Sequence, residues 1–335
     1  MCWNLRFHTF HNYNSIEMKL RIRHRTTYRY TQNVDFGPHT MMLRPREGHD
    51  VHIEQSVLQI SPAHRIDWFR DVYGNCLAVA QFSQSAKELM IFSDVVLNHF
   101  ESNPLDVYTE KGASKYPFAY KPETSLELST LMQPVYTNDS LLVQQWLMQF
   151  WHPGQTKDTL ALLREVNEYI YRTFRYQVRY EAGVQSPLQT MTKQSGSCRD
   201  FATLFIEACR CLGFGARFVS GYIVSGGATG PGASMHAWAE VYLPGVGWKG
   251  FDPTLGRLAM SEHVPVAVSR HPENVMPISG SFIGPVNAFL NIEVDVHVET
   301  LGVQNHTLST SQGALLNHEA RSRTGTRYRQ SLVLR

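Results

Sequence analysis

The spacing of apolar residues changes twice along this chain, and these changes constrain its fold more than any other feature. Over the first hundred residues the apolar positions alternate in period two, in short runs separated by turns such as Gly37-Pro38. Between residues 138 and 212 they recur at helical spacing, and from 216 to 252 the runs are strand-like again. A period of two predicts strands, and a period near 3.6 predicts helices. The chain is therefore expected to adopt an α+β fold with strands and helices in separate blocks.

At 335 residues the chain is long enough for two domains. Scattered prolines and a loss of periodicity mark a connector between the first strand block and the helices. Residues 261–299 predict an irregular wrap around the core, ending in an alternating strand at 289–298. We therefore expect five parts: an N-terminal extension at 1–17, a small sandwich-like β domain at 18–101, a connector at 102–134, a core with its C-terminal wrap at 135–300, and a flexible basic tail at 301–335.

The core pattern predicts helices packed on an antiparallel sheet. Capping residues at one end and Gly or Pro at the other delimit three expected helices, at 138–151, after Thr156, and at 198–212. Three strands are expected to follow, at 216–224, 236–243 and 247–252. The short connection from Pro244 to Gly247 predicts that the last two strands form a hairpin.

Composition excludes several classes of protein. A hydrophobic content of 43% with 18% charged residues is typical of a soluble globular protein. A net charge of +2 argues against a nucleic-acid-binding protein. No apolar run approaches a membrane span, and the first 18 residues lack the apolar stretch of a secretory signal. The five cysteines fit neither a disulfide framework nor a zinc pattern, so we expect a reducing, cytoplasmic location.

One cysteine stands where the backbone itself favours a thiolate. Cys198 lies between a turn and the third expected helix. The positive end of a helix dipole lowers the pKa of a thiol at such a place, and the neighbouring Arg199 adds to this effect. The N–H groups of a first helical turn have no partner within the helix, so the N–H of Cys198 can stabilise an oxyanion. Cys198 is therefore a candidate nucleophile.

A histidine and an aspartate follow on the two strands of the expected hairpin. His236 opens the first strand, and Asp252 closes the second. Side chains on paired strands can touch, so Asp252 can accept one imidazole N–H and leave the other nitrogen for Cys198. A nucleophile, a base and an orienting carboxylate suit attack on an amide or ester carbonyl. Taken singly, each residue also suits packing or a turn, and the three together could bind zinc.

Four segments around these residues resemble the core of the bacterial transglutaminase-like superfamily. They are residues 196–202, 217–222, 236–242 and 250–254. The first block is similar to the β-rich domain that accompanies such cores, through residues 28–30, 43–46 and 71–75. The resemblance implies a papain-like core in which a helix bearing Cys198 packs on an antiparallel sheet. It also implies that Cys198 is the nucleophile, His236 the base and Asp252 the orienting acid.

The resemblance raises a question about the oxyanion hole. Papain-like enzymes often place an upstream glutamine there, and Gln189 and Gln194 both precede Cys198. Each could also be a solvated loop amide. Trp238 follows His236 on the same face of its strand, which makes it a candidate wall of the cleft or an ordinary core aromatic.

The expected function is thiol-dependent acyl transfer on a protein or peptide substrate, without a cofactor or a metal. Hydrolysis of peptide or amide bonds is the preferred reaction, because no feature marks a site for an amine acceptor. Two alternatives remain open at this level. One is protein cross-linking by a glutamine γ-glutamyltransferase, and the other is a non-catalytic peptide-binding module on the same fold.

Overall fold

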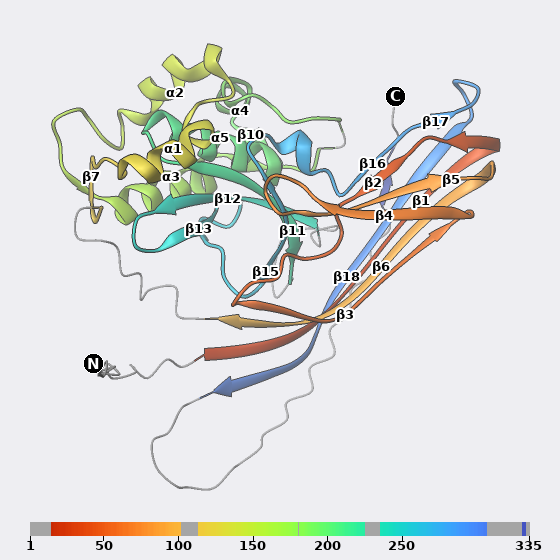
Figure 1. The fold of residues 1–335 in the computed structure, drawn as a ribbon. Coiled ribbons are helices and arrows are strands. Elements are labelled where there is room, and N and C mark those ends of the chain that lie inside the picture. Colours follow the sequence, from red (N-terminus) through yellow and green to blue (C-terminus); the bar gives the residue numbers. More distant parts are fainter. Residues whose placement is uncertain (1–14, 102–112, 180, 225–234, 307–329, 333–335) are drawn as a thin grey trace, which may run out of the picture.

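The computed structural model describes residues 15–101, 113–179, 181–224, 235–306 and 330–332. Figure 1 shows two lobes, a helical core with its own sheet and a set of long strands that leans against it. Helices and strands are both abundant and lie in separate blocks, so the expected α+β class is confirmed.

Long antiparallel strands form the main sheet of the β lobe. They are β1 (Ser15–Phe36), β3 (Val51–Ser61), β6 (Ala86–Glu101), β17 (Phe282–Ile283), β18 (Phe289–His306) and β19 (Gln330–Leu332). The order is β19-β18-β1-β6-β3, and β17 also pairs with β1. The predicted alternation is present in β1, where Leu20, Ile22 and His24 are buried while Arg21 and Arg23 between them reach solvent. A strand places alternate side chains on opposite faces, so one face of β1 meets the interior.

A second, smaller sheet covers one end of the first. Its strands are β2 (His39–Met41), β4 (His64–Arg70), β5 (Cys76–Phe82) and β16 (Ile278–Ser279), in the order β16-β2-β5-β4. Both sheets contribute buried apolar side chains to one cluster, with Tyr30 and Leu89 from the first and Met41 and Ala80 from the second. This packing is the sandwich-like arrangement that the sequence predicted.

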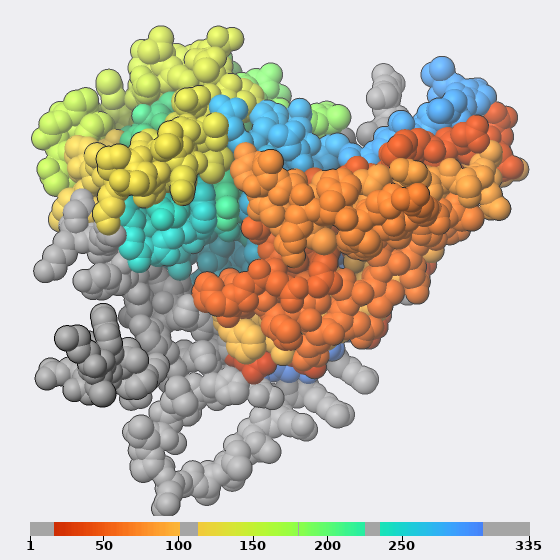
Figure 2. All heavy atoms as spheres, viewed as in Figure 1, coloured from red at the N-terminus to blue at the C-terminus, as the bar shows by residue number. Residues whose placement is uncertain are grey.

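The C-terminal part of the chain corrects the expected domain limits. Residues 289–298 were expected to wrap the core, but β18 pairs with β1 from Ser15↔His306 to Tyr30↔Phe289. The expected boundary at 300 therefore cuts through a strand of the β lobe. Figure 2 shows blue C-terminal atoms beside red and orange N-terminal atoms at the end of the β lobe that points away from the yellow and green helices. The pairing joins segments more than 250 residues apart in sequence, which no local pattern can indicate.

The other limits shift by smaller amounts. Strand β1 begins at Ser15, so the end of the expected extension at 1–17 belongs to the sheet. The expected tail at 301–335 begins inside β18, and its Gln330–Leu332 pairs with that strand. Residues 1–14, 307–329 and 333–335 lie outside the described part. The expected connector contains a helix, α1 (Pro122–Met132), which starts with a proline at its first position and buries Leu128 and Leu131.

The core sheet has the order β14-β13-β12-β11-β15 and is antiparallel throughout. Its strands are β11 (Ala216–Ile223), β12 (Met235–Leu243), β13 (Gly247–Asp252), β14 (Arg257–Leu258) and β15 (His263–Ser269). Strands β12 and β13 form the expected hairpin, with Leu243 opposite Gly247. Ala237, Ala239, Val241 and Leu243 of β12 are buried, and α5 (Cys198–Cys211) packs against this strand.

The remaining elements surround α5. They are α2 (Ser140–Leu147), α3 (Thr159–Thr173), α4 (Pro187–Lys193), the 3-10 turns η1 (Thr137–Asp139) and η2 (Pro272–Val275), and the short strands β7 (Lys115–Tyr116), β8 (Lys157–Asp158), β9 (Arg175–Tyr176) and β10 (Ser195–Gly196). Residues 200–210 of α5 are all buried, as expected for a helix enclosed on every side. No helix within the described ranges is long and apolar enough to cross a membrane.

The two lobes are joined by both apolar and polar contacts. One cluster of buried side chains contains Leu20 and Ile22 of β1 together with residues of α5 and the core sheet. The side chain of Asn75 donates to the carbonyl of Val268 at 2.7 Å and accepts from its N–H at 2.9 Å. His99 Nδ1 donates to the carbonyl of Ser261 at 2.6 Å. The β lobe is therefore a packed part of the molecule that borders the core sheet.

Candidate active site

Cys198 is the first residue of α5, where the sequence predicted a helix start. Its approach is fixed by β10, which pairs in parallel with β9 and places Gly196 beside Tyr176. A Cβ atom at Gly196 would lie 2.8 Å from Cβ of Asp200, so only glycine fits at this position. The thiol of Cys198 is half-buried and lines a cavity.

A buried carboxylate holds the start of α5. Asp200 has no exposed surface and accepts hydrogen bonds from the N–H and the hydroxyl of Ser197, both at 2.8 Å. It also accepts from the N–H of Gln185 and from Arg179, both at 2.7 Å. An acidic residue in a first helical turn stabilises the helix through its dipole. Asp200 therefore ties the segment before α4 to the helix end that carries Cys198.

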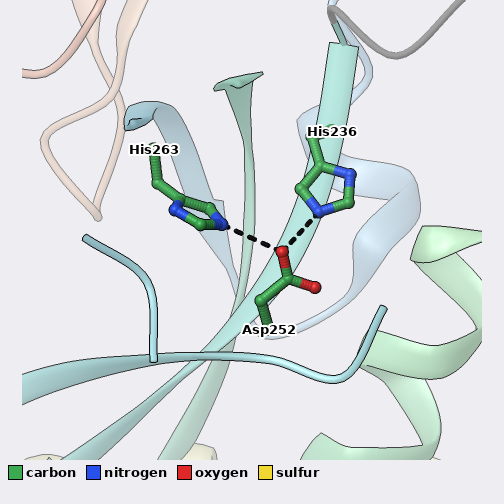
Figure 3. A group of neighbouring side chains, drawn as sticks. All are labelled: His236, Asp252 and His263. Carbon is green, nitrogen blue, oxygen red and sulfur yellow. Dashed lines mark hydrogen bonds and ion pairs between the residues drawn. The ribbon is translucent and has the colours of Figure 1, made fainter. Parts of the chain in front are cut away.

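His236 is the second residue of β12 and is 8% exposed. Its Nε2 donates to Oδ2 of Asp252 at 2.7 Å (Figure 3). This leaves Nδ1 for the thiol of Cys198. Burial opposes protonation of His236, but the charge of Asp252 and hydrogen bonds with Asp252 and Cys198 outweigh it and raise the pKa of His236 to about 10. At neutral pH the imidazole therefore carries a proton on both nitrogens.

Asp252 is the last residue of β13 and has no exposed surface. Its Oδ1 accepts from the backbone N–H groups of Thr254 at 2.8 Å and Leu255 at 3.2 Å. Burial alone would raise the pKa of Asp252, but the charge of His236 and hydrogen bonds from two histidines hold that pKa far below its usual range. The carboxylate is therefore ionised, as an orienting group must be.

The second of these histidines was not found from the sequence. His263 begins β15, is 3% exposed, and donates from Nε2 to Oδ2 of Asp252 at 2.9 Å. Its Nδ1 accepts from the N–H of Met260 at 3.2 Å, which assigns the proton to Nε2. Figure 3 shows the two imidazoles meeting the same carboxylate oxygen from different strands. The structure thus adds a fourth side chain to the expected three.

Comparison with family models agrees with this geometry. Residues 152–253 match the model of the transglutaminase-like superfamily, and residues 20–98 match the bacterial transglutaminase-like N-terminal region. The chain belongs to the transglutaminase-like superfamily. The resemblance stated from the sequence is therefore confirmed for both regions. Cys198 and the whole hairpin from His236 to Asp252 lie within the first match.

Relatives and solved structures agree with the whole-chain architecture. Uncharacterized proteins of Mycobacterium tuberculosis and Mycobacterium bovis are 26% identical over 294 residues, which is 83% of this chain and 92% of each relative. A solved structure from Cytophaga hutchinsonii, named as a proposed cysteine protease, aligns with a TM-score of 0.64 at 19% identity. That alignment covers 90% of this chain and 94% of the other, so the fold is shared across both lobes.

The two glutamines expected near the oxyanion hole of this transglutaminase-like core are elsewhere. Gln189 caps α4, where its side chain accepts from the N–H of Ser186 at 3.0 Å. Gln194 is exposed and ends α4 in a left-handed conformation with φ of 49°. Neither lines the cavity, so both assignments were wrong: α4, which the sequence analysis missed, uses these residues as its caps.

A different polar side chain lies near Cys198. Tyr176 of β9 lines the same cavity as the thiol and contacts the ring of Phe201. Burial, with the neighbouring Cys198 and Asp252, raises the pKa of Tyr176. Its hydroxyl therefore stays protonated and remains a hydrogen-bond donor.

Trp238 supports the site from behind and does not line the cavity. It is 2% exposed, stacks with His236 at 6.2 Å between ring centroids, and meets His263 edge-on at 5.1 Å. Val219 and Val268 pack around it. The expectation of a cleft wall is therefore wrong, and the core-aromatic alternative holds. The indole keeps water from the two imidazoles that hold Asp252.

His236, Asp252 and His263 also bring one possible ligand atom each within 4.8 Å of one another. Zinc would need its nitrogen and oxygen ligands about 2.0–2.2 Å away and arranged around a common centre. Here both Nε2 atoms point at Oδ2 itself, at 2.7 and 2.9 Å. The geometry fits a hydrogen-bonded group better than a metal site.

A cavity of about 400 Å³ opens beside Cys198 and His236. Both lobes line it: Phe218 and Met235 come from the core, and Tyr28 and Val294 come from β1 and β18. Its size suits a small ligand or the side chain of a larger one. The candidate nucleophile and base of the transglutaminase-like core therefore face a space that substrate could enter.

Proposed function

We propose that this protein is a thiol-dependent acyl-transfer enzyme that hydrolyses peptide or amide bonds. The observation that carries the proposal is the hydrogen-bonded series from Cys198 through His236 to Asp252, with the thiol and imidazole on the wall of one cavity. Membership of the transglutaminase-like superfamily supports a thiol-dependent enzyme in general. The roles of the three residues and the choice of hydrolysis are our inference.

The first half-reaction forms an acyl-enzyme. The thiol proton of Cys198 already resides on Nδ1 of the doubly protonated His236. The thiolate sulfur attacks the substrate carbonyl carbon, which becomes tetrahedral. The N–H of Cys198 and the hydroxyl of Tyr176 are the donors available to the oxyanion. When the intermediate collapses, the C–N bond breaks and Nδ1 gives its proton to the departing amine. A thioester with Cys198 remains.

The second half-reaction releases the acyl group. A water molecule attacks the thioester carbonyl while Nδ1 of His236 accepts one of its protons. The C–S bond breaks and a carboxylic acid leaves. The proton stays on Nδ1, which restores the pair of thiolate and protonated imidazole. Throughout, Asp252 fixes the ring by holding Nε2–H and stabilises its positive charge.

Alkylation by iodoacetamide tests the activated thiol directly. Mass spectrometry of the full chain at pH 7 would follow Cys198 and, in the same molecule, the half-buried Cys76 as an internal reference. We expect Cys198 to react faster than Cys76, and His236→Ala to slow it at least tenfold without affecting Cys76. If Cys198 were alkylated at the same rate in the wild type and in His236→Ala, the proposal would be refuted and a non-catalytic binding module favoured.

The acceptor of the acyl group needs a separate experiment, because water and an amine share the same first half-reaction. The protein would be incubated with casein and a fluorescent primary amine, and the products separated by size. Hydrolysis predicts shorter casein fragments that lack the label. Labelled casein of full length would overturn the preference for water and identify a transamidating enzyme.

A further inference from the structure

The cavity beside Cys198 has one wall made by the β lobe. Strands β1 and β18 pair so that Thr26 lies opposite Val294, and Tyr28 lies opposite Ile292. All four residues line the cavity, because alternate positions of paired strands share one face. The first and last long strands of the chain therefore build part of the site next to the thiol.

We propose that this cavity is the acyl-side subsite and that it accepts an uncharged, apolar side chain beside the bond that is cleaved. The inference rests on the proposed function, since it assigns a substrate class to the same thiol. It gives the β lobe a role in choosing the substrate. Peptides with a leucine-like or phenylalanine-like residue on the acyl side are the expected class.

The lining supports an apolar occupant. Beyond Ile292 and Val294, the core side presents Phe218, Met235 and Val275. Ligand pockets are commonly lined by such residues, and 400 Å³ leaves room for a large aliphatic or aromatic side chain. Burial of that side chain would favour it over glycine by roughly 10- to 100-fold.

His24 and Thr26 of the β wall are neutral and hydrogen-bonded. His24 Nδ1 lies 3.0 Å from the hydroxyl of Tyr222, and its Nε2 lies 3.1 Å from Oγ1 of Thr26. Burial lowers the pKa of His24 to about 4, so the ring is uncharged at neutral pH. This wall therefore offers no counter-ion to a charged side chain.

Both arginines along the described lining are held by the protein, although Nε of Arg199 has no hydrogen-bond partner. Arg179 forms an ion pair with Asp200 at 2.7 Å, and Arg199 donates to the carbonyl of Glu181 at 2.5 Å. The acidic Glu273 is exposed at the rim. A charged side chain seated against the apolar part of the lining, at Phe218, Ile292 and Val294, would lose its hydration without gaining a partner there. Glutamate and lysine are therefore expected to be excluded.

Alkylation by N-acetyl-aminoacyl chloromethyl ketones tests this selectivity. Each probe forms a C–S bond to Cys198 and releases chloride, so the second-order rate reports how well its side chain seats beside the thiol. Leucine, phenylalanine, glycine, glutamate and lysine probes would be compared, each rate divided by that of iodoacetamide. We expect the leucine and phenylalanine probes to react 10- to 100-fold faster than the glycine probe, and the glutamate and lysine probes no faster than glycine.

A matched pair of variants links the selectivity to the β wall. Val294→Phe would fill the cavity and should remove most of the preference for leucine over glycine. Val298→Phe lies on the same face of the same strand but outside the cavity lining, and should keep the wild-type ratio. Equal rates for leucine and glutamate probes, or a leucine preference unaltered by Val294→Phe, would overturn the subsite. Failure of the proposed function would instead show as iodoacetamide alkylation of Cys198 that does not respond to His236→Ala.

Discussion

Asp252 is held in place by more hydrogen bonds than its carboxylate needs for His236 alone. Its two oxygens accept four hydrogen bonds, two from backbone N–H groups and two from imidazoles. A buried carboxylate with every acceptor position occupied has one orientation available. The position of His236 is therefore determined by the turn after β13 and by β15, both of which hold Asp252, as well as by its own strand.

His263 is expected to act as a positioning residue through Asp252. His263→Leu removes one of the donors to Oδ2, and we expect alkylation of Cys198 to slow about tenfold, a loss of about 1.4 kcal/mol. His263→Gln keeps an N–H donor and should recover most of that rate. Iodoacetamide rates from pH 5 to 9, with melting temperatures, would separate positioning from folding. If His263→Leu and His263→Gln slowed the alkylation of Cys198 equally, His263 would not act as a positioning residue.

Chelation should leave the site intact. Because the two Nε2 atoms of the imidazoles point at Asp252 itself, we expect millimolar EDTA to change neither the alkylation rate of Cys198 nor the melting temperature. The same two measurements after dialysis and after addition of zinc complete the test. A rate that falls with EDTA and returns with zinc would show that the three side chains hold an ion.

At the level of elements, local signals were sufficient for α5, β12 and β13. A turn before Cys198 marks the start of α5, and the hairpin connection after Leu243 separates β12 from β13. Each of these elements carries its functional side chain at or next to one of its ends. His263 could not be found in this way, because β15 pairs with β11 on the far side of the sheet from β13. Trp238 shares its face with His236 as expected, but Val268 and Tyr73 cover that face. Those contacts come from distant parts of the chain.

A buried ion pair within α5 should be required for stability. Arg210 donates to Glu207 at 2.6 Å, and both side chains are at most 3% exposed. Glu207 also accepts from the N–H groups of Val135 and Tyr136, which ties the segment after α1 to α5. Arg210→Met would leave a buried carboxylate without its cation, and we expect a loss of about 3–5 kcal/mol in urea unfolding.

The exposed pair Arg172 and Glu168 provides the matched comparison on another helix. Because water screens such pairs, Arg172→Met should change the free energy of unfolding by less than about 1 kcal/mol. If the two substitutions had similar effects, the pair in α5 would not be a structural requirement.

For the whole molecule, the pairing of β1 with β18 has a consequence beyond the β lobe. It brings the first and the last long strand to the cavity beside Cys198, so the lining extends in sequence from His24 to Val294. The match to the N-terminal family model ends at residue 98 and omits β18. A fragment limited to the helical core would therefore lack one wall of the cavity, although it would retain Cys198, His236 and Asp252.

The contact between the lobes should be sensitive to acid through His24. Its pKa is lowered by burial to about 4, against 6.5 for the free side chain, so the unfolded chain binds the proton more readily. Stability is then lost as the pH falls from 6.5 towards 4, by up to about 3 kcal/mol. Urea unfolding of the wild type between pH 7 and 4 should show this loss, and His24→Gln should make stability depend less on pH.

Tyr222→Phe is the control, because it removes a partner of His24 without removing the titrating ring. It should lower stability at every pH, while the dependence of stability on pH remains. An equal slope in the wild type and His24→Gln would show that acid weakens the molecule elsewhere.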